Sequence, residues 1–225
     1  MPLPVVGITG IATQAGGQGP ITTPTGQTSQ ATGSSFLINL QQSGNDQTYG
    51  TVSDSYSNSY SIVKYVQTSD GFWLVSYLCV NGSGGPNHTA TGSNTNGGGM
   101  TMVELIEIKN ALTVNPLDQS NTNAVPGPGP CPCAVTPTTS GQLVIALALA
   151  ASSGNTLTPT GSYTIINTQL TNSPSYTSAG YANATTSSTD PDYAEFRPGQ
   201  AMGAITLSFK GGTPPVNNAT WLWKA

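Results

Sequence analysis

Short apolar segments alternate with clusters of turn residues along most of this chain, and this pattern limits its fold more than any other feature. Segments such as SSFLINLQQ (34–42), GFWLVSYLCV (71–80) and GQLVIALALAASSG (141–154) are rich in aromatic, β-branched and other apolar residues. Gly, Pro, Asn and Ser separate such segments about every ten residues, the spacing of a sandwich or barrel. No segment has convincing amphipathic helical periodicity. We therefore predict an all-β protein, an antiparallel β-sandwich with jelly-roll-like connections.

The predicted sandwich is a single domain over residues 34–212. Residues 1–33 are rich in Gly, Thr, Gln and Pro and predict an N-terminal arm or edge strand followed by a loop. Residues 213–225 form an apolar C-terminal tail. The pattern thus predicts one folded body with an extension at each end.

A weak internal echo runs through the predicted sandwich. SFLINL at residue 35 aligns with QLVIAL at residue 142, and SYSIV at residue 59 aligns with SYTII at residue 162, in the same order. The echo is either chance in a low-complexity β sequence or the trace of two related half-sheets, 34–112 and 141–212, packed face to face.

Charged side chains make up only 6% of the chain, and the net charge is -4. Few charges cause little repulsion between neighbouring copies, so dense packing of copies costs little. The five Lys and Arg residues are scattered singly and form no basic patch, which argues against nucleic-acid binding. The start, MPLPVVGITG, lacks the features of a signal peptide, and the longest apolar run is too short to span a membrane. Together these features predict no membrane partner and a place on a virion surface or outside the cell.

Three cysteines, Cys79, Cys131 and Cys133, cannot all pair within one chain. The last two lie in GPGPCPC and could be a redox pair or half of a metal site. The alternatives are a pair of unlinked loop thiols, or one thiol that is partnered with Cys79. Zinc needs about four ligands, and the single histidine, His88, leaves the set short. We predict no metal and no cofactor.

Catalytic groups are hard to find in this sequence. His88 lies in a Gly- and Asn-rich loop, which predicts a solvated side chain, and no serine lies in a G-x-S-x-G turn. Glu104 and Glu107 are three positions apart, so on a strand they face opposite sides and do not form a carboxylate pair. The acidic segment DPDYAEFRPG (190–199) is either a polar turn or a calcium loop. We predict no catalytic residues and no enzymatic activity.

The aromatic residues allow two interpretations. One is a platform on which a sugar stacks, formed by Phe72, Trp73, Tyr77, Tyr60, Tyr65, Trp221 and Trp223. By strand alternation, however, Trp73, Val75 and Tyr77 share one face of the segment 71–80, and the other face is also largely apolar. This favours a central, buried strand over the wall of a pocket.

Both ends of the chain carry candidate assembly contacts. Trp221, Leu222 and Trp223 are too apolar for a free terminus and predict docking on the domain or on a neighbouring copy. Near the N-terminus, the expected assembly contacts lie in a short apolar segment: Val5, Val6 and Ile8.

In these features the chain resembles a widespread, poorly characterised group of β-sandwich proteins in bacterial and phage genomes, over roughly residues 34–210. The pattern is a V-x-D-x-x-x-N-x-Y turn, a strand ending in a Gly-rich loop, a strand with one Glu, an N-P-L-D segment and a G-x-L-V-I-A strand. The matching positions are Val52 to Tyr60, Val75-Ser76-Tyr77 leading to Gly84-Gly85, Glu107, Asn115 to Asp118, and Gly141 to Ala146. The chain departs from this pattern at Ser57, where a glycine is usual. It departs again after Glu107, where an aromatic and a glycine are usual.

The resemblance implies a jelly-roll-like or immunoglobulin-like sandwich on a surface or a virion, and it supplies no catalytic residues. We therefore expect a structural surface protein: a phage capsid decoration, minor capsid or fibre protein that binds copies of itself and other virion or surface proteins. The alternative is a carbohydrate-binding adhesin, or a subunit of a bacterial extracellular filament. The glycan contacts expected for the adhesin are Asn87, His88, Asn94 and Asn96 in the loop 81–99.

Overall fold

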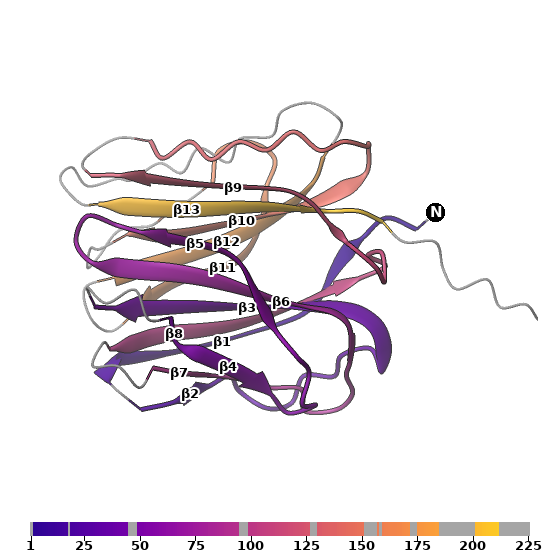
Figure 1. Ribbon diagram of the computed structural model, residues 1–225, viewed down its shortest axis with the longest axis horizontal. Coiled ribbons are helices and arrows are strands. Elements are labelled where there is room, and N and C mark those ends of the chain that lie inside the picture. Colours follow the sequence, from indigo (N-terminus) through magenta and orange to yellow (C-terminus); the bar gives the residue numbers. More distant parts are fainter. Residues whose placement is uncertain are drawn as a thin grey trace, which may run out of the picture.

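The structure, a computed structural model, describes residues 2–17, 19–44, 49–94, 99–126, 130–150, 157, 159–171, 175–184 and 201–211. In these residues the chain forms strands joined by turns and loops, and no helix (Figure 1). Every strand pair is antiparallel. The predicted fold class, an all-β antiparallel sandwich, is confirmed.

Two five-stranded sheets form the body of the molecule, and a three-stranded sheet covers one of them. Sheet A has the order β1-β8-β3-β6-β5, sheet B the order β11-β12-β10-β13-β9, and the cover sheet the order β2-β7-β4. The strands of sheet A are β1 (Val5–Gly17), β8 (Met100–Lys109), β3 (Thr32–Ser43), β6 (Phe72–Ser83) and β5 (Ser61–Gln67). Those of sheet B are β11 (Thr164–Thr171), β12 (Ser175–Ala184), β10 (Gln142–Ala150), β13 (Met202–Phe209) and β9 (Leu117–Val125). The cover sheet consists of β2 (Ile21–Thr22), β7 (Ala90–Ser93) and β4 (Thr51–Asp54).

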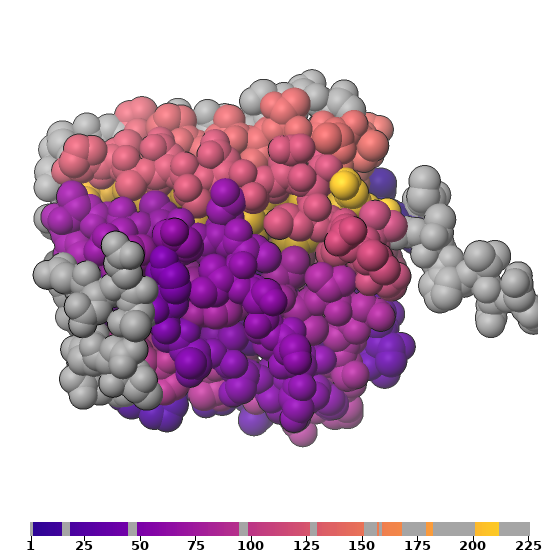
Figure 2. All heavy atoms as spheres, in the orientation of Figure 1, coloured from indigo at the N-terminus to yellow at the C-terminus, as the bar shows by residue number. Residues whose placement is uncertain are grey.

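The main core lies between sheets A and B. Leu37 and Ile106 of sheet A pack in one cluster with Ile145 and Leu207 of sheet B, all fully buried. Figure 2 shows the same division in space: the first half of the chain, indigo and purple, lies below the second half, pink and yellow. Each sheet therefore comes from one continuous half of the sequence.

The outer faces of both sheets are also covered. On sheet A, Ile38 and Val75 pack under Ile21 and Ala90 of the cover sheet. On sheet B, alanines of β10 and β13 pack with Cys131, Cys133 and Leu157, which belong to segments outside the sheets. Strands buried on both faces need apolar residues at nearly every position, which explains the continuous apolar run of β10.

Strand β6, the GFWLVSYLCV segment, is a buried inner strand of sheet A, as predicted. Trp73, Val75 and Tyr77 lie in the cluster under the cover sheet. Leu74 and Leu78 lie in the main core. The aromatic residues of this strand are therefore chiefly core residues.

The two main sheets share one connectivity. Sheet A uses β1, β3, β5, β6 and β8 in chain order, and sheet B uses β9, β10, β11, β12 and β13. When the strands of each set are numbered one to five, both sheets have the spatial order 1-5-2-4-3. Strands β2, β4 and β7 are additional pieces within connections of the first half. The two pairs of similar segments in the sequence echo lie on corresponding strands. One pair lies on the central strands β3 and β10, and the other lies on the edge strands β5 and β11.

The echo has the right register on the edge strands but not on the central ones. When the two segments are aligned residue by residue, Leu37 of the main core matches Val144, which lies on the outer face of sheet B. Because a shift of one residue exchanges the faces of a strand, the neighbouring Ile145 is the residue that faces the core like Leu37. On the edge strands, Ile62 and Ile165 occupy matching positions and are 42% and 41% exposed.

Three details differ from the sequence-based division of the chain. Residues 5–17 form β1, which pairs with β8 as an edge strand of sheet A; of the two alternatives for this segment, the edge strand is therefore right and the free arm is not. The predicted halves, 34–112 and 141–212, omit β1 and β9, two edge strands whose Gly and Asn residues give a weak strand signal. The jelly-roll detail is not confirmed, because each sheet draws on one half of the chain. The tail 213–225 lies outside the described residues.

Candidate functional site

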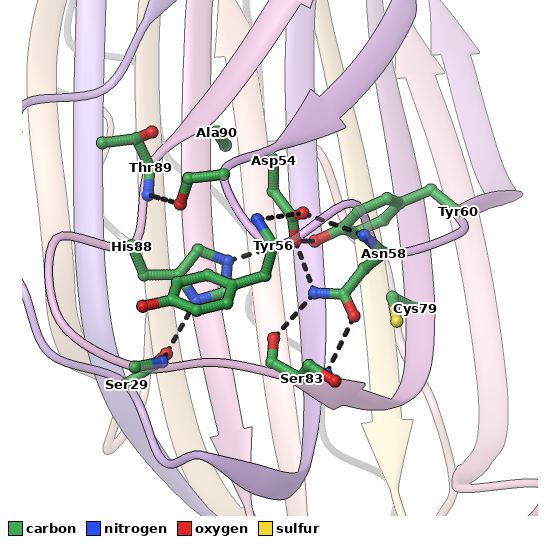
Figure 3. A network of polar contacts seen from close by, with 12 residues as sticks. Ser29, Asp54, Tyr56, Asn58, Tyr60, Cys79, Ser83, His88, Thr89 and Ala90 are labelled. Carbon is green, nitrogen blue, oxygen red and sulfur yellow. Dashed lines mark hydrogen bonds and ion pairs between the residues drawn. The ribbon is translucent and has the colours of Figure 1, made fainter.

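A polar network surrounds Asp54 at the end of β4 (Figure 3). Its Oδ1 accepts hydrogen bonds from the backbone N–H groups of Tyr56 and Asn58, both at 3.0 Å. Its Oδ2 accepts from Asn58 Nδ2 at 2.6 Å and from the Tyr60 hydroxyl at 2.7 Å. The D-x-x-x-N-x-Y spacing thus places three donor residues around one carboxylate, which closes the turn after β4.

The backbone of this turn explains one departure from the group that the chain resembles. Ser57 has a φ of 56°, in the left-handed region that glycine adopts without steric cost. The second departure has the same cause, because Asn110, three positions after Glu107, has a φ of 60°. Asparagine tolerates this region better than most residues, so Asn110 adopts it at low cost, whereas Ser57 is strained there.

His88 extends the network toward a second segment of the chain. Its Nε2 lies 3.1 Å from Asp54 Oδ2, and its Nδ1 lies 2.7 Å from Ser29 Oγ. Ser29 Oγ also accepts from the Gly85 N–H at 3.0 Å, and the Asp54 carboxylate can only accept a hydrogen bond. This leaves Nε2 as the protonated nitrogen that donates to Asp54. The rings of Phe36 and Tyr56 pack edge-on against the imidazole, with centroids 4.5 and 4.9 Å away.

The expectation of a solvated His88 was wrong, since the residue is 1% exposed. The sequence hid its role because its partners, Asp54 and Ser29, lie 34 and 59 positions away. Of the whole network, only the turn around Asp54 could be recognised from the local sequence, through the V-x-D-x-x-x-N-x-Y pattern. Long-range polar contacts of this kind leave no periodicity that could predict them.

The network also perturbs the titration of its acidic members. Burial alone would raise the pKa of Asp54, but hydrogen bonds from His88, Tyr60 and Asn58 hold it well below its ordinary value. Burial and the bond to this carboxylate raise the pKa of the Tyr60 phenol far above its ordinary value. At neutral pH the carboxylate is therefore ionised and the phenol neutral.

Ser29, His88 and Asp54 are the residue types of a hydrolytic triad, but their placement fits a structural clamp. A nucleophile has to reach a substrate, whereas Ser29 and His88 are buried between the cover sheet and sheet A. Asn58 adds a second link, because it donates to Ser83 O and accepts from Ser83 N, both at 2.8 Å. The network joins the turn after β4 to the loop before β3 and the loop after β6.

Glu107 is a second clamp, on β8. Its carboxylate accepts from Ile8 N at 3.1 Å, Gln30 N at 2.8 Å and Ser34 Oγ at 2.7 Å. Lys109 Nζ lies 3.7 Å away. The side chain therefore ties β1 and the β2–β3 connection to the centre of sheet A.

Asp118, the acid of the N-P-L-D segment, is a similar clamp in sheet B. Asp118 accepts from the backbone N–H and the hydroxyl of Thr138, both at 2.7 Å, and pairs with Lys210 at 3.3 Å. It fixes the loop that runs from β9 to β10. The acids of the three matched motifs thus hold segments of the fold together.

The structure separates Glu104 from Glu107, as predicted. Glu104 Oε2 accepts from Asn39 Nδ2 at 2.9 Å, and Oε1 accepts from Asn167 of sheet B. Because Asn167 belongs to the other sheet, Glu104 points into the space between the sheets. Burial raises its pKa to about 7, although the two amide bonds oppose this shift.

The cysteines are buried and form no disulfide. Cys131 Sγ and Cys133 Sγ donate to the backbone carbonyls of Asn123 and Ala204, at 3.7 and 3.6 Å. They belong to the segment that packs on the outer face of sheet B. Within the described ranges, no group of three or more His, Cys, Asp or Glu residues is placed to hold a metal ion. The acidic segment 190–199 lies outside those ranges.

The residues expected to contact a glycan do not form one exposed surface. Asn87 is exposed and its Oδ1 accepts from Gly26 N at 3.1 Å, whereas Asn94 and His88 are buried. Burial removes these two from contact with an external glycan, which corrects that expectation. Asn96 lies outside the described residues, as do Trp221, Leu222 and Trp223.

The expected N-terminal assembly contacts lie together on β1, an edge strand of sheet A. Val5 is 40% exposed, Val6 packs partly against the main core, and Ile8 packs partly against the cluster under the cover sheet. Strand β1 lies near β11, the edge of sheet B, and β5 lies near β9 at the opposite side. The sandwich therefore has two sides, each formed by two neighbouring edge strands.

These two sides differ in charge. Strands β1 (VVGITGIATQAGG) and β11 (TIINTQLT) contain no charged residue. On the opposite side, β5 carries Lys64 and β9 carries Asp118. This difference between the two sides becomes visible only when the pairing of the strands is known.

No protein-family model, curated protein or solved structure matches this chain. In the part of the chain described here, no helix has the length and apolar character needed to cross a membrane.

Proposed function

We propose that this protein is a structural surface protein whose subunits join side by side through the uncharged edge strands β1 and β11. The observation that carries the proposal is the absence of charge from both strands of this side, while β5 on the opposite side carries Lys64. Asp118 of β9 does not count as such a charge, because its buried carboxylate is held by Thr138 and Lys210. A charged side chain on an edge strand is a common protection against pairing with another chain. The β1–β11 side lacks this protection.

The edge itself offers the groups that a neighbouring subunit needs. An edge strand presents unpaired backbone N–H and C=O groups, which can continue the sheet into a second chain. Strand β1 has register shifts near both ends, and its run from Thr9 to Thr13 is regular. Val5 on β1 and Ile165 on β11 add exposed apolar surface. Backbone pairing and apolar contact can thus act on the same side.

A virion shell, fibre or extracellular filament is the setting in which such joining is useful. The low charge of the chain keeps repulsion between tiled copies small. The layers are held by internal clamps around Asp54, Glu107 and Asp118, so most of the buried acid groups described here serve the fold. On this proposal the partners are copies of the chain and other surface proteins, and no reaction is performed.

The test is self-association of two matched variants. Ile165→Lys places a charge on β11, and Ile62→Lys places the same charge at the equivalent, equally exposed position of β5. We expect the purified protein to self-associate with rising concentration in light scattering after size-exclusion chromatography. Ile165→Lys should reduce this association and Ile62→Lys should leave it unchanged. A chain that stays monomeric at every concentration, or equal effects of both variants, would contradict the proposal.

A further inference from the structure

A shallow groove lies on the outer face of sheet A, beside the edge of the cover sheet. Its volume is about 460 Å³. Strands β4 and β5, which border it, lie on the face turned toward the viewer in Figures 1 and 2. The lining residues are Tyr49, Gly50, Thr51, Val52, Tyr60, Ile62 and Tyr77. Three of them are tyrosines and the others are small or apolar.

Aromatic rings continue from the groove along β5. The ring of Tyr49 lies 4.8 Å from that of Tyr65 in a tilted arrangement, and Trp73 meets Tyr49 edge-on at 5.5 Å. Tyr65 is 49% exposed, and Ile62 beside it is also exposed. The buried Trp73 supports Tyr49 from below. A rigid aromatic surface is thus open to solvent at this edge of the sheet.

The groove is polar without being charged. The hydroxyls of Tyr77 and Tyr60 donate to Gly50 O and to Asp54, and each phenol oxygen can still accept a hydrogen bond. Burial raises the pKa of Tyr77 to about 12, and burial with a hydrogen bond to Tyr65 raises that of Tyr49 to about 12. The phenols are therefore neutral, and no residue of the lining carries a charge at neutral pH.

We propose that this groove binds a neutral sugar ring of a glycan. A sugar ring has an apolar C–H face, which suits an exposed aromatic ring, and hydroxyls, which suit phenol and threonine oxygens. An uncharged lining favours an uncharged ligand, because a charged one would lose hydration without gaining a counter-charge. The volume fits one or two rings and is small for a folded partner.

This inference goes beyond the assembly proposal and concerns another surface. The groove is bordered by β4 and β5, whereas assembly is assigned to β1 and β11 on the other side of the sandwich. It also differs from the loop 81–99, where glycan contacts were expected from the sequence. A protein with both features would tile a surface and present sugar sites outward.

The test uses three neutral probes, maltotriose, cellotriose and triacetylchitotriose, with the complete chain. Saturation-transfer difference NMR detects binding, and titration gives the dissociation constant. Ile62→Ser removes an exposed residue of the groove, Tyr65→Ser removes the exposed ring that packs on Tyr49 beside it, and Val114→Ser removes an exposed apolar residue elsewhere. We expect at least one probe to bind, about tenfold weaker binding by each groove variant, and unchanged binding by the control. Thermal unfolding shows that all variants are folded.

Two results would overturn the sugar assignment. One is the absence of binding for all three probes at millimolar concentration. The other is binding that Tyr65→Ser and Ile62→Ser leave unchanged. A synthetic peptide of residues 213–225 is included as a competing occupant. If this peptide shifts the signals of the groove and no sugar does, the groove is a peptide site and the proposal is wrong. A negative result for sugar binding would leave the self-association test with Ile165→Lys unaffected.

Discussion

Replacing the buried acid Glu104 should make the protein more stable at high pH. Its carboxylate is fully buried between the two sheets and accepts hydrogen bonds from Asn39 and Asn167. A small cavity of about 40 Å³ beside it is lined by Thr9, Gly10, Ile11, Ile166 and Asn167, which are all uncharged. With no cation among these neighbours, burial dominates and raises the pKa of Glu104 from 4.5 to about 7.

The sign of the pH effect follows from this raised pKa. Between pH 4.5 and 7 the unfolded chain releases the Glu104 proton while the folded chain keeps it, so folding takes up a proton and stability falls as pH rises. The difference between 4.5 and about 7 corresponds to about 3 kcal/mol of lost stability, complete above pH 7. Asp54 has a lowered pKa, and its contribution is lost only as pH falls below its ordinary value of 3.8. The two effects therefore occur in separate pH ranges.

Glutamine should replace Glu104 without losing a hydrogen bond. Asn167 Oδ1 is buried and has no hydrogen-bond partner in the described structure. Rotating the Asn167 amide would turn this oxygen toward the new Nε2 of Glu104→Gln, while the remaining oxygen still accepts from Asn39. We expect the variant to match the parent near pH 4.5 and to exceed its free energy of unfolding by up to about 3 kcal/mol at pH 8.

The assay is urea unfolding at pH 4.5, 5.5, 6.5, 7.5 and 8.5, all in about 0.15 M salt. The control is Glu107→Gln on the same strand. Glu107 accepts from three donors beside Lys109, so an amide there would face a donor and cost about 2 kcal/mol at pH 8. Parallel curves for Glu104→Gln and the parent, or a less stable Glu104→Gln at pH 8, would refute the reasoning.

Three further outcomes follow from the network and the thiols. Asp54→Asn should lower the free energy of unfolding by roughly 3 kcal/mol in urea titrations, because the new NH₂ would face other donors; a loss below about 1 kcal/mol would contradict the clamp. Ser57→Gly should raise it by roughly 0.5 to 1 kcal/mol, since glycine adopts the left-handed φ freely, and an unchanged melting temperature would argue against strain there. Cys79, Cys131 and Cys133 should react with a thiol reagent only in guanidinium, because all are buried; rapid reaction of the native protein would show an open segment.

Local features of the sequence were sufficient for the fold class and for the burial of β6. Strand alternation places Trp73 and Leu74 on opposite faces, and both faces are apolar, so the position of β6 inside the sheet followed directly. The turn signals marked most connections. The internal echo also named the central and edge strands that correspond in the two sheets, although its register on the central strands was out by one residue.

The surroundings of His88 and the extent of β1 could not be read in the same way. His88 stands in a loop of Gly and Asn, and its burial depends on Ser29 and Asp54 from distant segments. Strand β1 interrupts its Val and Ile residues with Gly and Ala, which have little intrinsic strand preference, and its pairing with β8 supplies the missing stabilisation. In both cases contacts between remote segments outweighed local preference.

What the residue pattern settled was the type of element, because apolar alternation and turn chemistry act over a few neighbouring residues. The edge strands, the partners of Asp54 and the tyrosine groove were decided by the pairing of segments that are distant in the sequence. Strands β3 and β8, where Asn39 meets Glu104, are one example. Pairing on that scale is chosen by the burial of whole sheet faces. The proposed assembly side and the proposed sugar groove are both products of that choice.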